Sequence, residues 1–195
     1  YIEENNDIST LDTGSGEIIT AGNTHWNVGH GQRFSYPISW SPDSRWIAFT
    51  IGHDNAQEAI YVFKLESQQL HRVSSGFYSD SSPVFSPCGK YLFYFTNRNF
   101  SPAYSALDDT WIYPNATQLA ALSLLPDTPS LLEPKNDKVE VTKADNGEET
   151  GEDADEIVEI DFSDIESRLV VLPPDAGNLS SLTAIDGKVI YIRRP

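Results

Sequence analysis

The sequence reads Trp40-Ser41-Pro42-Asp43-Ser44-Arg45-Trp46-Ile47-Ala48-Phe49 and, 45 positions later, Phe85-Ser86-Pro87-Cys88-Gly89-Lys90-Tyr91-Leu92-Phe93-Tyr94. In both stretches an aromatic residue, Ser-Pro, a two-residue turn, a cation and an apolar strand follow in the same order. Proline fixes φ at the start of the turn, and the two residues after it reverse the chain. A strand-containing repeat of this length is typical of one four-stranded blade of a β-propeller, which takes ~40–50 residues.

Strand-forming residues dominate the rest of the sequence. Short runs of β-branched and aromatic residues, bounded by turn-forming residues, occupy 47–50, 60–63, 91–95 and 189–192, and such runs predict strands. The leucine-rich run at 116–125 fits a short helix or a buried strand. Because prolines flank it and its apolar residues alternate loosely, we expect a strand. The sequence therefore predicts an all-β protein.

The repeats divide the chain into parts of blades. We expect 1–22 to form the outer strands of one blade, 23–76 a complete blade, 77–172 a larger blade with a long excursion, and 173–195 the inner strands of a further blade. About three four-stranded blades are fewer than the ~4–8 that close a propeller. The predicted fold is an incomplete β-propeller, and we expect the remaining blades of a longer chain, or further copies, to cover its open faces.

The composition excludes several classes of partner. The chain has 195 residues with 13 basic and 29 acidic side chains, a formal charge of −16. We expect no nucleic acid partner, because binding phosphates draws on clusters of Lys and Arg. No apolar run approaches the ~20 residues that span a bilayer, and the N-terminus lacks a signal-peptide layout. We therefore expect no membrane partner and a cytoplasmic location, or a periplasmic one if a signal peptide has been removed.

Most of the negative charge lies in one stretch. Residues 133–166 contain 14 acids and 3 lysines, and residues 145–156 contain no large apolar side chain. Such a segment has little with which to offset the entropy of ordering. We predict a mobile acidic surface loop at about 135–158. A calcium site or a docking tail remains open, although the spacing of an EF-hand loop is missing.

Four histidines raise the question of a metal site: His25, His30, His53 and His71. His25 and His30 are five positions apart, unlike the i, i+4 pair of a helical metal site, and no cysteine or acid cluster adjoins them. We interpret this stretch as a connection between blades, whose histidines bond locally or line the propeller mouth. We assign no metal ligand and no cofactor.

The candidate nucleophiles have structural interpretations. Serines are abundant, notably at Ser35 and around Ser79 and Ser82, but none lies in a Gly-x-Ser-x-Gly elbow, so we assign no catalytic residue. The single cysteine, Cys88, permits no internal disulfide; it replaces Asp in a predicted turn, and only Lys90 is at hand to activate it. The glycosylation pattern at 115–117 is interpreted as accidental. Five aromatic residues near the turns are expected to fill the spaces between blades: Trp40, Trp46, Phe85, Tyr91 and Phe93.

Several motifs carry a resemblance to a known family. The repeated Ser-Pro turn is similar to that of TolB and tricorn propellers. The long third-blade excursion of tricorn-type proteases is resembled by residues 96–102, by the stretch from 111–113 to 122–124, and by residues 127–134. Residues 160–173 resemble the segment I-D-hydrophobic-x-x-I-x-x-R-hydrophobic-x-x-L-P of that family, and 177–182 and 191–195 continue the likeness. Ser44 and Cys88 depart from the usual Gly and Asp of the two turns.

The resemblance implies the second, seven-bladed propeller of a tricorn-type serine protease, with its catalytic domain elsewhere in the parent chain. Such a segment is non-catalytic and guides oligopeptide substrates to the distant serine. The expected partners are the other blades and catalytic domains of the parent chain, peptide substrates and further copies in a homo-oligomer. Two alternatives stay open: a TolB-like propeller that binds a protein and serves no peptidase, and the propeller of a prolyl-oligopeptidase-like hydrolase.

Overall fold

The computed structural model describes all residues except 4, 25–35, 100, 108, 113 and 134–156. The described residues form two four-stranded antiparallel sheets, three two-stranded sheets and one short 3₁₀ helix. Strands were predicted at 47–50, 60–63, 91–95 and 189–192, and each is found in β4, β5, β8 or β14. The prediction of an all-β, incomplete propeller is confirmed, because the described residues form antiparallel sheets, none of which closes on itself.

The first four-stranded sheet has the order β3-β4-β5-β6. Its strands are β3 (Ser39–Trp40), β4 (Trp46–Gly52), β5 (Glu58–Lys64) and β6 (Gln69–Arg72). Every residue of β4 is buried, as expected for a central strand covered on both faces. Each strand pairs with its neighbour in sequence, which makes the sheet a simple meander.

The second four-stranded sheet has the order β7-β8-β11-β12 and contains two insertions. Its strands are β7 (Asp80–Phe85), β8 (Tyr91–Thr96), β11 (Gln118–Ser123) and β12 (Leu169–Val171). A hairpin of β9 (Ala103–Ser105) and β10 (Thr110–Ile112) lies between β8 and β11. The acidic insertion and η1 (Ile165–Arg168) lie between β11 and β12. The 116–125 run is thus a strand, as predicted.

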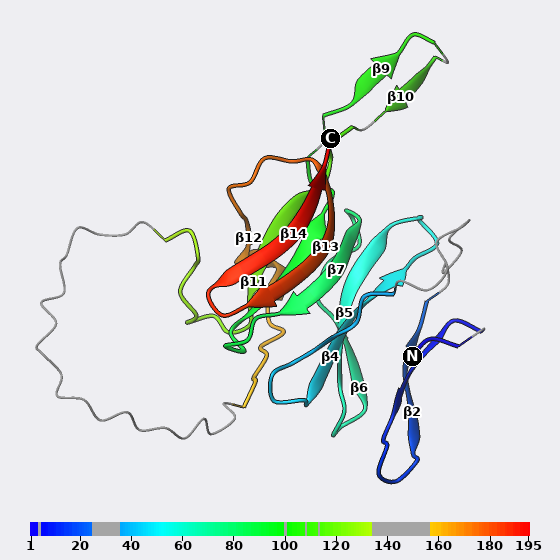
Figure 1. Cartoon of the computed structure of the whole chain (residues 1–195), viewed down its shortest axis with the longest axis vertical. Coiled ribbons are helices and arrows are strands. Elements are labelled where there is room, and N and C mark those ends of the chain that lie inside the picture. The colour runs from blue at the N-terminus through cyan, green and yellow to red at the C-terminus, as the bar shows by residue number, and fades with distance from the viewer. Residues whose placement is uncertain (4, 25–35, 100, 108, 113, 134–156) are drawn as a thin grey trace, which may run out of the picture.

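Two hairpins flank these sheets. β1 (Asp7–Leu11) pairs with β2 (Ile18–Asn23), and β13 (Asn178–Ile185) pairs with β14 (Lys188–Arg194). The first strands of successive sheets, β3, β7 and β13, lie next to one another, and the Phe85 amide donates to the Ser39 hydroxyl at 3.0 Å. Neighbouring sheets are therefore joined through their first strands, which we call the inner strands (Figure 1). The boundaries proposed for the blades, at 22/23, 76/77 and 172/173, remain a prediction.

Two apolar clusters form the core between neighbouring sheets. The β1–β2 hairpin packs Ile8 and Ala21 against Ile47 and Phe49 of β4. The larger cluster joins the two four-stranded sheets through the other face of β4 and includes Trp46, Phe85 and Tyr94.

The predicted role of the five aromatic residues holds for most of them. Trp46, Phe85 and Phe93 are buried and Tyr91 is half-buried. The prediction is wrong for Trp40, which does not fill a space between sheets: it is 49% exposed, whereas its counterpart Phe85 is 4% exposed. Trp40 pairs with Ile47 and so faces the two-stranded sheet, which covers less of its neighbour than four strands do.

Candidate functional site

Residues 157–168, which we call the wedge segment, run between the two four-stranded sheets. Val158 is buried beside both Ser-Pro turns: its amide donates to Asp43 Oδ2 at 2.8 Å, and its carbonyl accepts from Trp46 Nε1 at 3.0 Å. A Cβ on Gly89 would lie 2.9 Å from Val158 Cγ2. Of the predicted mobile acidic loop, about 135–158, only Ile157 and Val158 lie among the described residues, and the prediction is wrong for Val158, which is buried and hydrogen-bonded. The segment after it therefore fastens the two repeat turns together.

The conformation of the two Ser-Pro turns explains why Val158 binds beside them. The amides of Ser44 and Gly89 donate to the carbonyls of Ser41 and Ser86, which closes each turn. In the first turn, Asp43 Oδ1 also accepts from the Ser41 hydroxyl at 2.5 Å. Partial burial opposes ionisation of Asp43, but hydrogen bonds from Ser41, Val158 and Arg45 outweigh it and lower its pKa. Asp43 is therefore an ionised acceptor for the wedge segment.

An aromatic stack holds the middle of the wedge segment. The ring of Phe162 lies parallel to that of His71 on β6, with centroids 4.1 Å apart, and both rings lie about 6 Å from Trp46. Burial, and then the nearby Lys64, lower the pKa of His71. His71 therefore acts as a neutral packing residue. A groove of about 760 Å³ runs past this stack, lined by Arg45 and Lys64 as well as by the wedge segment.

Arg168 fastens the end of the wedge segment to β11. Its guanidinium donates to four backbone carbonyls: Ser123 at 2.9 Å, Ser163 at 2.9 Å, Leu124 at 3.2 Å and Asp161. Arginine suits this position because its planar head presents five donors in a fixed arrangement. The arginine of the resembled family segment is therefore a structural crosslink in this chain.

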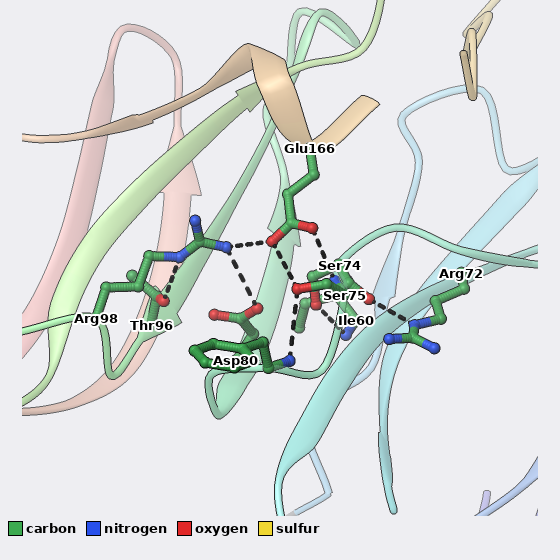
Figure 2. A network of polar contacts seen from close by, with 9 residues as sticks. Ile60, Arg72, Ser74, Ser75, Asp80, Thr96, Arg98 and Glu166 are labelled. Atoms are coloured by element: carbon green, nitrogen blue, oxygen red, sulfur yellow. Dashed lines mark hydrogen bonds and ion pairs between the residues drawn. The ribbon is translucent and has the colours of Figure 1, made fainter. Parts of the chain in front are cut away.

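A polar network joins the wedge segment to the junction between the sheets (Figure 2). Glu166 accepts hydrogen bonds from the Ser75 amide at 3.0 Å, the Ser75 hydroxyl at 3.1 Å and Arg98 Nη2 at 2.5 Å. Ser75 belongs to the connection between β6 and β7, and Arg98 follows β8. Glu166 thus holds together three segments that are far apart in the sequence.

Asp80 is the unusual member of this network. Its carboxylate is fully buried, lies 3.9 Å from Arg98 Nη2, and accepts no hydrogen bond of normal geometry from the described residues. Burial raises the pKa of Asp80, although the nearby hydroxyls of Thr96 and Ser74 and the charge of Arg98 act in the opposite direction. Burial also raises the pKa of Tyr94, whose hydroxyl is likewise buried without a partner among the described residues. Because Arg98 also pairs with Glu166, its positive charge offsets the cost of burying the Asp80 carboxylate only in part.

The structure separates the predicted candidate residues. His25, His30 and Ser35 lie outside the described residues. His53 stacks on Tyr61, with Nε2 3.2 Å from its hydroxyl, and lines a cavity of about 380 Å³ together with Ser79. Cys88 is an exposed free thiol whose sulfur lies 3.3 Å from the Ser86 hydroxyl.

The metal and membrane findings concern only the part of the chain that the structure describes. Within it, no three His, Cys, Asp or Glu side chains gather in a way that could hold a metal ion. No helix in the same part has the length and apolar character needed to cross a membrane.

Sequence reasoning missed the Asp80–Arg98–Glu166 network. These residues are 18 and 68 positions apart, and no local pattern links them. The one available signal was that Glu166 and Arg168 lie in the family-like segment 160–173. The network can tie segments together and bury charge at a sheet junction. Among its described residues, its one hydroxyl within hydrogen-bond distance of a carboxylate, that of Ser75, donates to Glu166, which also accepts from Arg98 and from the Ser75 amide; we interpret the network as a structural clamp.

Comparisons with known proteins agree with this architecture. Residues 18–195 match the family described as the tricorn protease second beta propeller domain. A tricorn-like protease C-terminal subunit of Sulfurisphaera tokodaii is 24% identical over 71% of this chain and 14% of its own length. Tricorn protease homolog 1 of Streptomyces coelicolor is 23% identical over 81% of this chain and 15% of its length.

Solved structures show the same fold. The crystal structure of the tricorn protease superposes on 92% of this chain and 16% of its own, with a TM-score of 0.64 at 18% identity. The chain thus spans about one seventh of the length of these relatives. Because the family match covers most of the sequence, the chain belongs to the tricorn protease second beta propeller domain family.

Proposed function

We propose that this chain is a non-catalytic propeller segment of a tricorn-like peptidase, and that it guides oligopeptides to a serine protease domain elsewhere in the parent protein. The observation that carries the proposal is the match of residues 18–195 to the second propeller domain of tricorn proteases. The names of the longer relatives, which call them proteases, support it.

The arrangement of the sheets suggests how guidance operates. The inner strand β7 contacts both β3 and β13, the first strands of the neighbouring sheets, and in a propeller such strands surround an axial channel. A channel of this kind admits an extended peptide and excludes a folded protein on steric grounds. The guiding action thus resides in inner-strand residues, and the wedge segment stabilises the spacing of the sheets behind them.

Photocrosslinking in the full-length protein tests the path. With the catalytic serine blocked by a fluorophosphonate, an unfolded peptide of about twelve residues carrying a benzophenone is irradiated with the protein, and adducts are mapped by mass spectrometry. We expect adducts on β7 or β13. The matched control is the same peptide sequence held inside a small disulfide-bonded protein, which is expected to give none. Adducts restricted to the outer strands β6 and β12 would overturn the guiding role.

A hydrolysis assay tests the non-catalytic role. The 195-residue chain alone is expected to leave fluorogenic peptides intact, because in the proposed parent protein the catalytic serine lies in a separate domain. Turnover that disappears on replacing one of its own serines, for example Ser79→Ala beside His53, would contradict the proposal. Turnover that no such replacement changes comes from a contaminating peptidase. After further purification, the chain is then expected to be inactive.

A further inference from the structure

One cation at the junction of the two four-stranded sheets faces two carboxylates (Figure 2). Nη2 of Arg98 lies 2.5 Å from Glu166 Oε1 and 3.9 Å from Asp80 Oδ2. In the described part of the chain, neither carboxylate forms an ion pair with another cation. The single charge of Arg98 therefore balances only one of the two negative charges at close range.

The two carboxylates differ in their access to water. The Asp80 side chain is 0% exposed and accepts no hydrogen bond from the described residues, whereas the Glu166 side chain is 31% exposed and accepts two hydrogen bonds from Ser75. A buried charge without a partner costs far more than a hydrated one. An ionised Asp80 thus needs Arg98 more than Glu166 does. The observed pairing of Arg98 with Glu166 is the one expected while Asp80 carries a proton, and burial raises the pKa of Asp80 accordingly.

The surroundings of Asp80 accommodate both protonation states. The Asp80 carboxyl interacts with groups on three elements: Tyr94, Thr96 and Arg98 of β8 and the turn after it, Ser74 of the β6–β7 connection, and Glu166 of η1. The Thr96 hydroxyl accepts from Arg98 Nε at 3.1 Å, and the Ser74 hydroxyl accepts from a backbone amide at 3.0 Å. Each hydroxyl therefore retains its own hydrogen to donate to an ionised carboxylate. Tyr94 stays neutral, because burial raises its pKa.

We propose that Asp80 is a proton-controlled switch: when Asp80 loses its proton to water, Arg98 Nη2 moves from Glu166 to Asp80, and the hold of Glu166 on Ser75 weakens. The movement is small, since closing 3.9 Å to the length of a charge-assisted hydrogen bond takes about 1 Å. Glu166 then has no cation and is repelled by the ionised Asp80. Because its side chain is already partly exposed, it turns toward water at little cost.

The switch acts on one end of the wedge segment. Because the pKa of folded Asp80 is raised from 3.8, the segment is fastened at Glu166 below the raised value and is loosened there as pH rises through it. The fastenings of Val158 to the Ser-Pro turn and of Arg168 to β11 do not involve Asp80. The junction between the sheets therefore loosens locally and the sheets stay joined.

Hydrogen exchange of the Ser75 amide in the full-length protein tests the switch. Asp80→Asn keeps this side chain neutral at every pH and so mimics the protonated state. Comparison of the wild type with Asp80→Asn at each pH, from about 4 to 8, cancels the intrinsic effect of pH on exchange. We expect equal rates at the acidic end. At the alkaline end we expect exchange about tenfold faster in the wild type, because a hydrogen bond to a charged group is lost.

Infrared spectroscopy follows the proton itself. A protonated carboxyl has a carbonyl absorption that its ionised form lacks, and the absorption that is missing from Asp80→Asn belongs to Asp80. We expect this absorption to disappear over the same pH range in which Ser75 exchange accelerates. In Glu166→Gln, which leaves Arg98 to Asp80 alone, we expect the absorption to disappear at lower pH, by roughly one unit, with fast Ser75 exchange throughout.

Asp164→Asn is the matched control, because it makes the same chemical change at an exposed residue two positions before Glu166. It is expected to retain the pH dependence of the wild type. The switch is refuted if the Asp80 absorption disappears while Ser75 exchange stays constant, or if Asp80 keeps one protonation state over the whole range. Acceleration that persists in Asp80→Asn also refutes it, because another group, such as His71 stacked on the wedge segment, then controls the junction.

Discussion

At the residue scale, the last position of the two Ser-Pro turns has the same backbone conformation with different side chains. Ser44 has φ of 58° and Gly89 has φ of 66°, the left-handed region in which an L-residue costs roughly 1–2 kcal/mol. At Gly89 a Cβ would also meet Val158. Glycine is therefore required at 89, whereas Ser44 is tolerated with strain.

This difference predicts opposite effects of matched substitutions. Ser44→Gly is expected to raise the free energy of unfolding by about 0.5–1 kcal/mol, since relief of strain exceeds the entropy that glycine loses. Gly89→Ser is expected to lower it by more than 1 kcal/mol, because strain and overpacking add. Urea unfolding measures both. Equal effects of the same sign would show that the wedge segment does not discriminate between the turns.

At the scale of elements, the wedge segment depends on Glu166. Glu166→Gln retains the shape of the side chain but loses the charge that faces Arg98, so we expect the chain to lose about 1–2 kcal/mol of stability. The Ser75 amide, which donates to Glu166, is expected to exchange its hydrogen faster. Exposed Glu159 lies on the same segment, and Glu159→Gln provides the matched control. Unchanged Ser75 exchange in Glu166→Gln would rule out the clamp.

Asp80 makes the same junction sensitive to pH. The groups facing it are Arg98, Glu166 and Tyr94, with the hydroxyls of Thr96 and Ser74. Burial raises the pKa of Asp80 from 3.8, so the folded state binds this proton more tightly than the unfolded state. The contribution to stability is therefore complete below the unfolded value and is lost as pH rises through the raised folded value.

Comparison with a neutral isostere isolates this contribution. Asp80→Asn is expected to gain stability relative to the wild type as pH rises above about 4, because the amide has no charge to bury. Denaturation curves from pH 3.5 to 8 measure the difference in free energy of unfolding between Asp80→Asn and the wild type. The other carboxyls titrate in both proteins, so their contribution cancels in this difference. A difference that is independent of pH would mean that Asp80 titrates alike in the folded and unfolded states.

At the scale of the whole molecule, the incomplete propeller leaves one face of the last hairpin open. Ile185, Ile190 and Ile192 lie on that face and are about half exposed, whereas Val189 and Tyr191 on the other face are half-buried. The isolated chain therefore presents an apolar surface on this hairpin. In the proposed parent protein, we expect a further blade to cover this face.

Substitutions on the two faces are expected to behave differently. Ile190→Lys is expected to reduce concentration-dependent light scattering of the isolated chain without lowering its free energy of unfolding, because the site is open to water. Val189→Lys, one residue away, is expected to lower the free energy of unfolding by about 1–3 kcal/mol, because it buries a charge. Equal loss of stability in both variants would show that the face around Ile190 is already covered.

The sequence by itself was sufficient to predict the all-β class and the strands that carry strong local signals, among them β4, β5, β8, β11 and β14. Turn chemistry and short apolar runs act over a few residues, so the Ser-Pro repeat was sufficient to predict β4 and β8, and a run of β-branched and aromatic residues was sufficient to predict β5. Only the tertiary structure decided how the sheets are joined. The contacts of Val158 with Asp43 and Trp46, and of Glu166 with Ser75 and Arg98, connect residues separated by 68 to 115 positions. Tertiary packing likewise set the different exposure of Trp40 and Phe85, because burial depends on which sheet lies opposite, and local sequence carries no record of that neighbour.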